Sequence, residues 1–290
     1  MVVSRPPALA LVVLVTVAVF SSSVGGAAPS WSLDVTPPSL LQGQTMRVRI
    51  RGVPPGAAIR LTVGFARVPV HRVAGGVQAY AGTSPLTAPG DLTIRAEARS
   101  ATGVTRRSRQ VRVRREAFGT RRLTVPPPLL DPALAAIERR KIAQATAAPI
   151  ATPQWRAPFR LPVDGPITSG YGVRSIYNGV LRGYHWGVDF RAATGTPVRA
   201  AASGLVTLAE RLPLSGNIVV LDHGAGVFTT YQHLSATAVR RGARVVKGDV
   251  VGRAGSTGLS TGPHLHWGMR INGVRVNPLY WTAEGGLTAP

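Results

Sequence analysis

Apolar and polar residues alternate strictly in three segments of the first half of the chain. These segments are TMRVRIRG at residues 45–52, DLTIRAEAR at 91–99 and RQVRVRRE at 109–116. A period of two is typical of a β-strand that buries one face, and the other face is rich in arginine here. Gly and Pro pairs between the segments indicate turns. We therefore predict an antiparallel β-sandwich of the Ig-like kind over residues 29–118.

The pattern changes after this region. Asp131-Pro132 is a typical N-cap and first-turn pair, and good helix formers follow over residues 133–147. These features predict a linker at residues 119–158 that contains one short helix.

Strand-like segments return in the second half, and no segment there has the pattern of a long helix. GNIVVLD and GVFTTYQHLS are rich in β-branched and aromatic residues, and Asn272-Gly273 between apolar flanks indicates a type I′ hairpin. The prediction is a mainly β protein whose second domain, residues 159–290, is an antiparallel β-sheet domain.

The first residues predict an export signal. Arg5 precedes an apolar run over residues 8–20, which is shorter than the roughly 20 residues of a membrane span. Small residues follow, and this order is typical of a signal peptide, here residues 1–28. We therefore expect an exported, extracytoplasmic protein that acts in the cell wall, in the periplasm or after secretion.

Composition narrows the possible chemistry. The chain has no cysteine, which excludes thiol catalysis and cysteine-bound zinc, so any metal needs histidine and carboxylate ligands. The formal net charge is +22. For an exported protein this charge favours anionic cell-wall polymers or a membrane surface as partners rather than nucleic acid. The GSTGLSTG run lacks the Lys-Ser/Thr ending of a phosphate-binding loop, so no nucleotide partner is expected.

Five of the six histidines lie after residue 180, and the sixth, His71, is predicted to be a solvated strand residue. His223 lies in an Asp-His-Gly turn between strands and is left out of the predicted site. His185 and Asp189 form an HxxxD pattern, and His264 and His266 form an HxH pattern. On extended strands, residues i, i+2 and i+4 face the same side. His185, Asp189 and one residue of the HxH pair would supply the three N/O ligands of a catalytic zinc site. The pattern alone does not say which histidine of the pair binds the metal.

These motifs and the segments between them resemble the lysostaphin-type, or LytM-domain, zinc metallopeptidases. The similarity includes TSGYGVR, GTPVRAAASGLV and VKGDVVGRAGSTGLSTGPHLHW, and it covers nearly all of the second domain. The first domain resembles the Ig-like domain that precedes the peptidase domain in some members. The resemblance implies a secreted endopeptidase that cleaves the peptide part of peptidoglycan with one Zn²⁺ per chain.

The resemblance also implies a role for each site residue. His185, Asp189 and His266 would bind zinc, while His233 and His264 would act on the substrate, in an order that stays open. Arg174 aligns with a frequent family position near the cleft and would bind a substrate carboxylate. Since all these residues follow residue 170, we expect the first domain to be dispensable for chemistry.

Two other classes remain as alternatives. A non-catalytic family member would bind the wall and activate another hydrolase, but such members typically lack metal ligands that this chain retains. A carrier domain would need a modifiable lysine at an exposed hairpin tip, and Lys247 in VVKGDVVG is a poor candidate.

Overall fold

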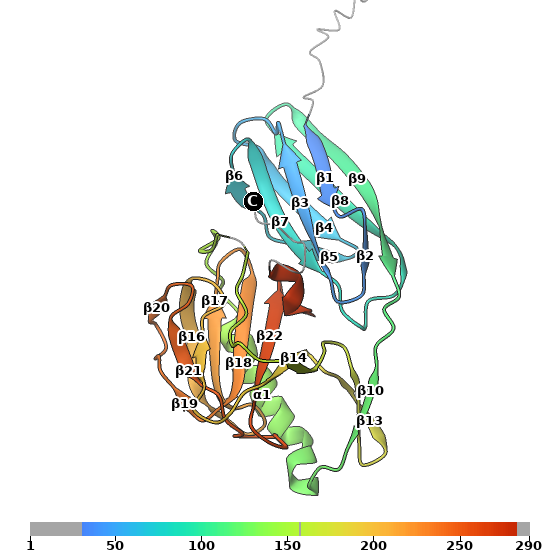
Figure 1. Ribbon diagram of the computed structural model, residues 1–290. Coiled ribbons are helices and arrows are strands. Elements are labelled where there is room, and N and C mark those ends of the chain that lie inside the picture. The colour runs from blue at the N-terminus through green and yellow to red at the C-terminus, as the bar shows by residue number, and fades with distance from the viewer. Residues whose placement is uncertain (1–30, 157, 283–290) are drawn as a thin grey trace, which may run out of the picture.

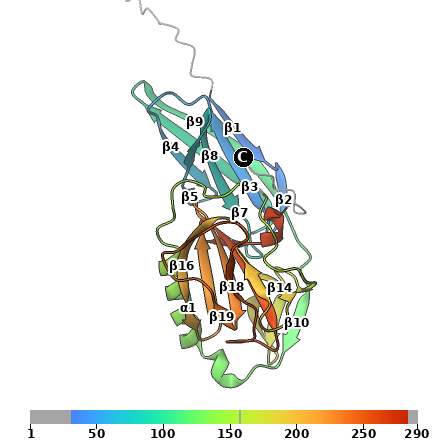
Figure 2. The same ribbon diagram turned by 60° about the vertical axis from the view of Figure 1, so that its left-hand side comes forward.

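The computed structural model describes residues 31–156 and 158–282, so the predicted signal peptide lies outside the described residues. Two β-rich bodies are stacked along the long axis of the molecule, with the earlier strands in one body and the later strands in the other (Figure 1). The single α-helix of the described residues lies against the later body, as the turned view also shows (Figure 2). The mainly β fold is therefore confirmed.

The N-terminal sandwich consists of two sheets that share one apolar core. One sheet has the order β1 (Ser32–Thr36), β3 (Thr45–Arg51), β7 (Gly76–Gly82), β6 (His71–Val73). The other has the order β2 (Ser39–Leu41), β9 (Gly103–Arg114), β8 (Gly90–Ser100), β4 (Ala58–Val63), β5 (Ala66–Val68).

The alternation in the sequence explains this core. Met46, Val48 and Ile50 of β3 are fully buried, and so are Val111 and Val113 of β9. On the opposite faces of these strands, Arg112 is exposed and Arg47 and Arg49 are half-buried. Burying one face of each strand against the other sheet is the main source of stability in such a sandwich. The Ig-like assignment itself stays a prediction.

The C-terminal domain is built around two antiparallel sheets. Its largest sheet has the order β11 (Ile167–Ser169), β14 (Gly187–Arg191), β22 (His264–Ile271), β18 (Val227–Leu234), β17 (Gly216–Asp222), β16 (Gly204–Leu212), β20 (Arg244–Val245), with β23 (Val274–Val276) beside β22. A smaller sheet has the order β15 (Pro197–Arg199), β21 (Val250–Arg253), β19 (Ala236–Thr237). Asn272 and Gly273 both have positive φ in the β22–β23 turn, which confirms the predicted hairpin.

The segment between the two bodies packs on the C-terminal domain rather than standing free. Strand β10 (Thr120–Leu123) joins a third sheet, in the order β10, β12 (Arg174–Tyr177), β13 (Val180–Tyr184). A 3₁₀ turn, η1 (Pro127–Leu130), leads to helix α1 (Pro132–Ala145), and a second 3₁₀ turn, η2 (Pro278–Trp281), follows β23. The Asp131 side chain accepts a hydrogen bond from the Ala133 amide at 2.8 Å, so the predicted N-cap is confirmed.

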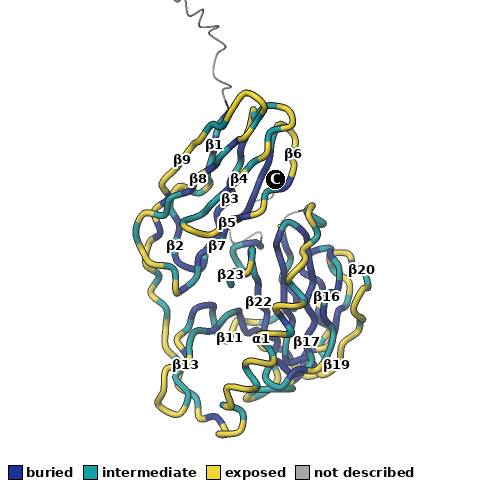
Figure 3. Tube along the Cα trace, turned by 180° about the vertical axis from the view of Figure 1, so that it is seen from behind, coloured by how far each residue is buried: buried dark blue, intermediate teal, exposed yellow. Residues whose placement is uncertain are grey.

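An aromatic cluster joins the two bodies. Tyr80 of β7 is 2% exposed and packs with Trp155 and Trp281 of the C-terminal part, at ring-centroid distances of 6.0 and 5.0 Å. The Trp281 indole donates to Thr45 Oγ1, and the Asn272 amide donates to the Tyr80 carbonyl. Both the strands of the sandwich and the later strands contain long buried segments (Figure 3). The N-terminal sandwich is thus fixed to the C-terminal domain by shared core residues.

One residue prediction was wrong at this junction. We expected His71 to be a solvated strand residue, but it is only 6% exposed and its ring stacks on Tyr80 at 6.0 Å. Burial lowers its pKa from the ordinary value.

The described residues contain no helix that is both long and apolar enough to cross a membrane.

Candidate metal centre and cleft

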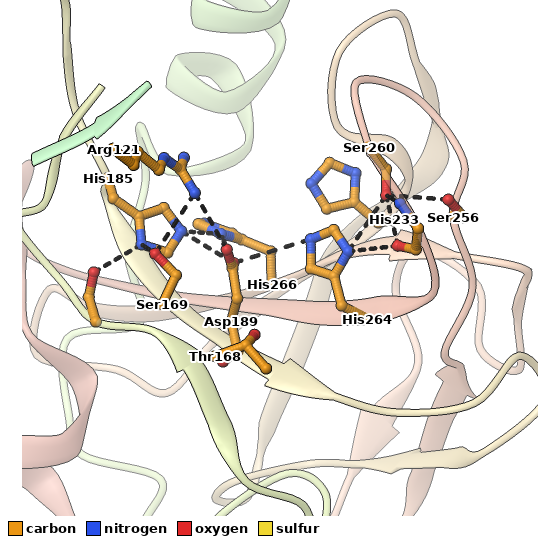
Figure 4. A network of polar contacts seen from close by, with 12 residues as sticks. Arg121, Thr168, Ser169, His185, Asp189, His233, Ser256, Ser260, His264 and His266 are labelled. Atoms are coloured by element: carbon orange, nitrogen blue, oxygen red, sulfur yellow. Dashed lines mark hydrogen bonds and ion pairs between the residues drawn. The ribbon is translucent and has the colours of Figure 1, made fainter. Parts of the chain in front are cut away.

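Neighbouring strands bring the HxxxD and HxH motifs together. Strands β14 and β22 pair antiparallel with Asp189 opposite His266, and His185 lies just before β14. Leu265 and Trp267 of β22 point into the core with no exposure, so His264 and His266 must face the other side. Figure 4 shows the side chains of His185, Asp189 and His266 gathered at one place, with His264 beside them.

The three predicted ligands form a compact cluster. Asp189 Oδ1 lies 2.9 Å from His185 Nε2 and 2.8 Å from His266 Nδ1, and the two ring nitrogens are 3.0 Å apart. Burial raises the pKa of Asp189, but the adjacent rings of His185 and His266 outweigh it and hold the pKa well below the usual range. The carboxylate is therefore ionised and available as a ligand.

The other ring nitrogen of His185 fixes its tautomer. His185 Nδ1 lies 2.7 Å from the Gly170 carbonyl oxygen, which can only accept a hydrogen bond, so Nδ1 carries the proton. The lone pair of Nε2 then faces Asp189 and His266. Metal-binding histidines are commonly held in this way, with the second nitrogen on a backbone carbonyl. One ligand atom from each of His185, Asp189 and His266 can face the same point, and these atoms all lie within 4.8 Å of one another. Two imidazole nitrogens and one carboxylate oxygen in this arrangement fit a divalent cation such as Zn²⁺.

The two remaining histidines lie beside this cluster. The rings of His233 and His264 have centroids 4.8 Å apart, and His264 Nε2 is 3.9 Å from Asp189 Oδ1. His233 Nδ1 donates to the Thr257 carbonyl at 2.8 Å, and His264 Nδ1 donates to the Gly262 carbonyl at 2.8 Å. Burial first, and then the charges of His266 and His264, lower the pKa of His233 to about 3. His233 is therefore a neutral ring near pH 7.

Arg174, which was predicted to lie in the site, and His223, which was not, both lie apart from this arrangement. Arg174 is exposed on β12 and is not among the residues that line the cleft, so the structure does not bring it to the metal cluster. His223 is fully buried, with hydrogen bonds to the Ser203 carbonyl and the Thr229 hydroxyl. The sequence had placed His223 outside the site, and it does lie outside the cleft lining.

The linker contributes a residue that the sequence did not single out. Arg121 of β10 donates to Asp189 Oδ2 at 3.4 Å, and its Nε donates to the Ser175 hydroxyl at 3.0 Å (Figure 4). The carboxylate thus presents Oδ1 to the two histidines and Oδ2 to the guanidinium. No motif spacing signals this contact, because Arg121 and Asp189 are 68 positions apart.

The linker also forms one side of the cleft. The cleft has a volume of about 420 Å³ and is lined by residues of β10, η1 and α1 as well as by the histidine cluster. The Glu138 carboxylate of α1 accepts hydrogen bonds from the amides of Leu214 and Ser215, both at 2.6 Å. The His233 amide in turn donates to the Ser215 carbonyl at 2.9 Å. Helix α1 is therefore tied to the backbone that carries His233.

The sequence profile of Peptidase family M23 matches residues 183–278, which contain the five acidic and histidine residues of the site. The C-terminal domain belongs to peptidase family M23. The DD-carboxypeptidase/endopeptidase Mpg of Neisseria meningitidis is 52% identical over 95 residues, which are 33% of this chain and 22% of that protein.

Two further comparisons extend the picture. The peptidoglycan DD-endopeptidase ShyA of Vibrio cholerae is 39% identical over 127 residues, which are 43% of this chain and 30% of that protein. This chain therefore matches less than a third of the length of these two relatives. The crystal structure of a protein from Pseudomonas aeruginosa described as a peptidase M23 is similar to this chain, with a TM-score of 0.64 and 28% sequence identity. The similarity covers 84% of this chain and 95% of that chain. That likeness includes part of the N-terminal sandwich, since it extends well beyond the M23 domain.

Proposed function

We propose that this protein is an exported, zinc-dependent endopeptidase that hydrolyses a peptide bond in the peptide part of bacterial peptidoglycan. The convergence of His185, Asp189 and His266 on one point in an open cleft carries the proposal. The M23 domain and the names of its relatives support peptidoglycan as the substrate class.

Each residue of the site has a part in this reaction. His185, Asp189 and His266 would hold one Zn²⁺, which as a Lewis acid would polarise the scissile carbonyl and lower the pKa of a bound water to about 7. His233 and His264 both present Nε2 as an acceptor, because their Nδ1 protons are held on backbone carbonyls. Either ring can then accept a proton from the attacking water and return it to the leaving amine.

The complete set of five site residues disfavours the alternative of a non-catalytic activator. A carrier domain is disfavoured by Lys247, whose amine donates to the Pro158 carbonyl at 2.6 Å.

The arginine-rich face of the N-terminal sandwich supports an anionic partner. Some of these charges are balanced locally, since Arg106 and Arg112 pair with Glu97 and Asp91.

The test is mass spectrometry of the fragments that the zinc-loaded protein releases from purified peptidoglycan. New amino groups and carboxyl groups at one peptide position are expected, and they would name the bond. Release of sugar fragments alone, or fragment release only when a second hydrolase is added, would contradict the proposal.

A further inference from the structure

Strand β22 continues past the catalytic histidines to a charged residue on the same face. His264, His266, Gly268 and Arg270 alternate with Leu265, Trp267, Met269 and Ile271, which are buried in the core. Arg270 is therefore directed to the cleft, and it is one of the cleft-lining residues. Its Cα lies about 13 Å along the strand from that of His266, at about 3.3 Å per residue.

A second arginine lies opposite the first. The β22–β23 hairpin pairs Arg270 with Arg275, which also lines the cleft. The Arg275 guanidinium lies 4.9 Å from the centre of the Trp186 ring, and Trp186 forms part of the same wall. Two like charges directly opposite each other in a hairpin destabilise it. An arrangement of this kind is explained if an anion binds between or beside them.

The protein itself supplies no such anion. Among residues 31–156 and 158–282, no carboxylate oxygen lies within 4.0 Å of a side-chain nitrogen of Arg270 or Arg275. Burial first, and then the charge of Arg275, lower the pKa of Arg270 to about 10. Both guanidinium groups are thus half-buried positive charges that keep their proton at neutral pH.

Small residues line the cleft between the histidines and the arginines. Gly268 lies between His266 and Arg270, and a Cβ added there would come within 2.6 Å of Thr230 Oγ1. Gly187, its partner on β14, would place a Cβ 2.6 Å from His266 Nε2. The space at both glycines is therefore already filled by neighbouring side chains. Between His266 and Arg270 the cleft wall is formed by Gly268 and by the small Thr230 side chain, which also lines the cleft.

We propose that Arg270 and Arg275 form a subsite that binds a carboxylate of the peptide substrate. The guanidinium fork matches a carboxylate in shape and charge. Allowing for the length of an arginine side chain, the bound carboxylate belongs to a residue about two to four positions from the scissile bond. This inference rests on the proposed peptidoglycan endopeptidase activity and adds a preference for acidic stem peptides over amidated ones.

The test compares one substrate in two charge states. A purified cross-linked muropeptide dimer is used as isolated and after conversion of its carboxylates to amides with carbodiimide and ammonia. A charge-assisted contact predicts that kcat/KM of the wild type is about 10- to 100-fold higher for the acid form. Arg270→Gln and Arg275→Gln should bring the acid-to-amide ratio close to 1, whereas Arg270→Lys should keep part of it.

Arg241→Gln is the matched control, since Arg241 is exposed and does not line the cleft. It should keep the wild-type ratio. Zinc content and melting temperature of each variant report whether the fold is intact. A wild-type ratio near 1, or a full ratio in both glutamine variants, overturns the subsite.

A binding measurement separates this proposal from the proposed function. Calorimetry with both dimers on the His264→Ala background should show tighter binding of the acid form, and the added Arg270→Gln change should remove the difference. If the wild type cleaves neither dimer, the endopeptidase proposal fails, and equal affinity for the two dimers would then also refute the arginine subsite.

Discussion

His233 and His264 are held by the same kind of contact, although they come from different strands. Each ring has Nδ1 on a backbone carbonyl and Nε2 free to face the cleft, while His266 has Nδ1 against Asp189. The difference between His264 and His266 is therefore one of ring orientation and of neighbours, which a motif alone does not contain.

We predict that the two histidines of GPHLHWG fail differently when changed. His266→Ala removes one of three proposed ligands, so zinc should be lost together with activity. His264→Ala leaves the three ligands, so zinc should stay near one equivalent while hydrolysis falls by about 10²- to 10⁴-fold. Elemental analysis and a peptidoglycan-release assay on each variant check this. Zinc loss in His264→Ala with retention in His266→Ala would reverse the assigned roles.

His223 predicts a pH effect on stability that is separate from catalysis. Burial lowers its pKa from 6.5 to about 4. Between pH 4 and pH 6.5 the unfolded chain therefore binds a proton at this ring, whereas the folded protein does not. Stability should therefore be fully present above pH 6.5 and decline by about 3 kcal/mol as the pH falls to 4. Denaturant unfolding at several pH values, with His223→Gln beside the wild type, measures this contribution. An identical pH dependence in both proteins would contradict it.

At the scale of elements, the sequence shows the alternation of core-facing and cleft-facing residues along β22. It also shows that the two histidines of HxH lie on the same face of that strand. The same parity could have indicated Arg270, because it continues the face that carries the histidines. Arg121 and Glu138 could not be found in this way, because their contacts depend on how the linker folds back on the C-terminal domain. Short-range periodicity predicts which face a residue takes, but not which distant segment lies opposite.

This packing changes our expectation for the linker. We predict that Arg121→Ala weakens zinc binding about 10- to 100-fold, because the Asp189 carboxylate loses the partner that orients Oδ2. Arg122→Ala is the control, since the next residue of β10 is exposed. The zinc dissociation constant, measured by competition with a chelator, decides the matter, and equal constants for the two variants would refute an orienting role.

At the scale of the whole molecule, the N-terminal sandwich packs directly on the C-terminal domain through the aromatic cluster around Tyr80. The sequence predicted two β bodies and one helix between them, because each has its own pattern. It did not predict that Tyr80 packs into the C-terminal core, since aromatic residues on a strand indicate burial without naming the partner.

We predict that Tyr80→Ala destabilises the full chain by about 3–5 kcal/mol, because it empties a site among Trp155 and Trp281. Phe65→Ala, at a fully exposed position, should change stability by less than about 0.5 kcal/mol. Denaturant unfolding of both variants is the measurement. A change below about 1 kcal/mol for Tyr80→Ala would mean that the two bodies are not energetically coupled through this residue.

The most direct test of the account is the metal dependence of hydrolysis by the wild type. The protein is stripped with a chelator and titrated with Zn²⁺ while the release of soluble peptide fragments from purified peptidoglycan is followed. We predict no release from the stripped protein and a rise that saturates at one equivalent of zinc per chain. Full activity of the stripped protein, or no activity with one equivalent bound, would contradict a zinc peptidase built on His185, Asp189 and His266.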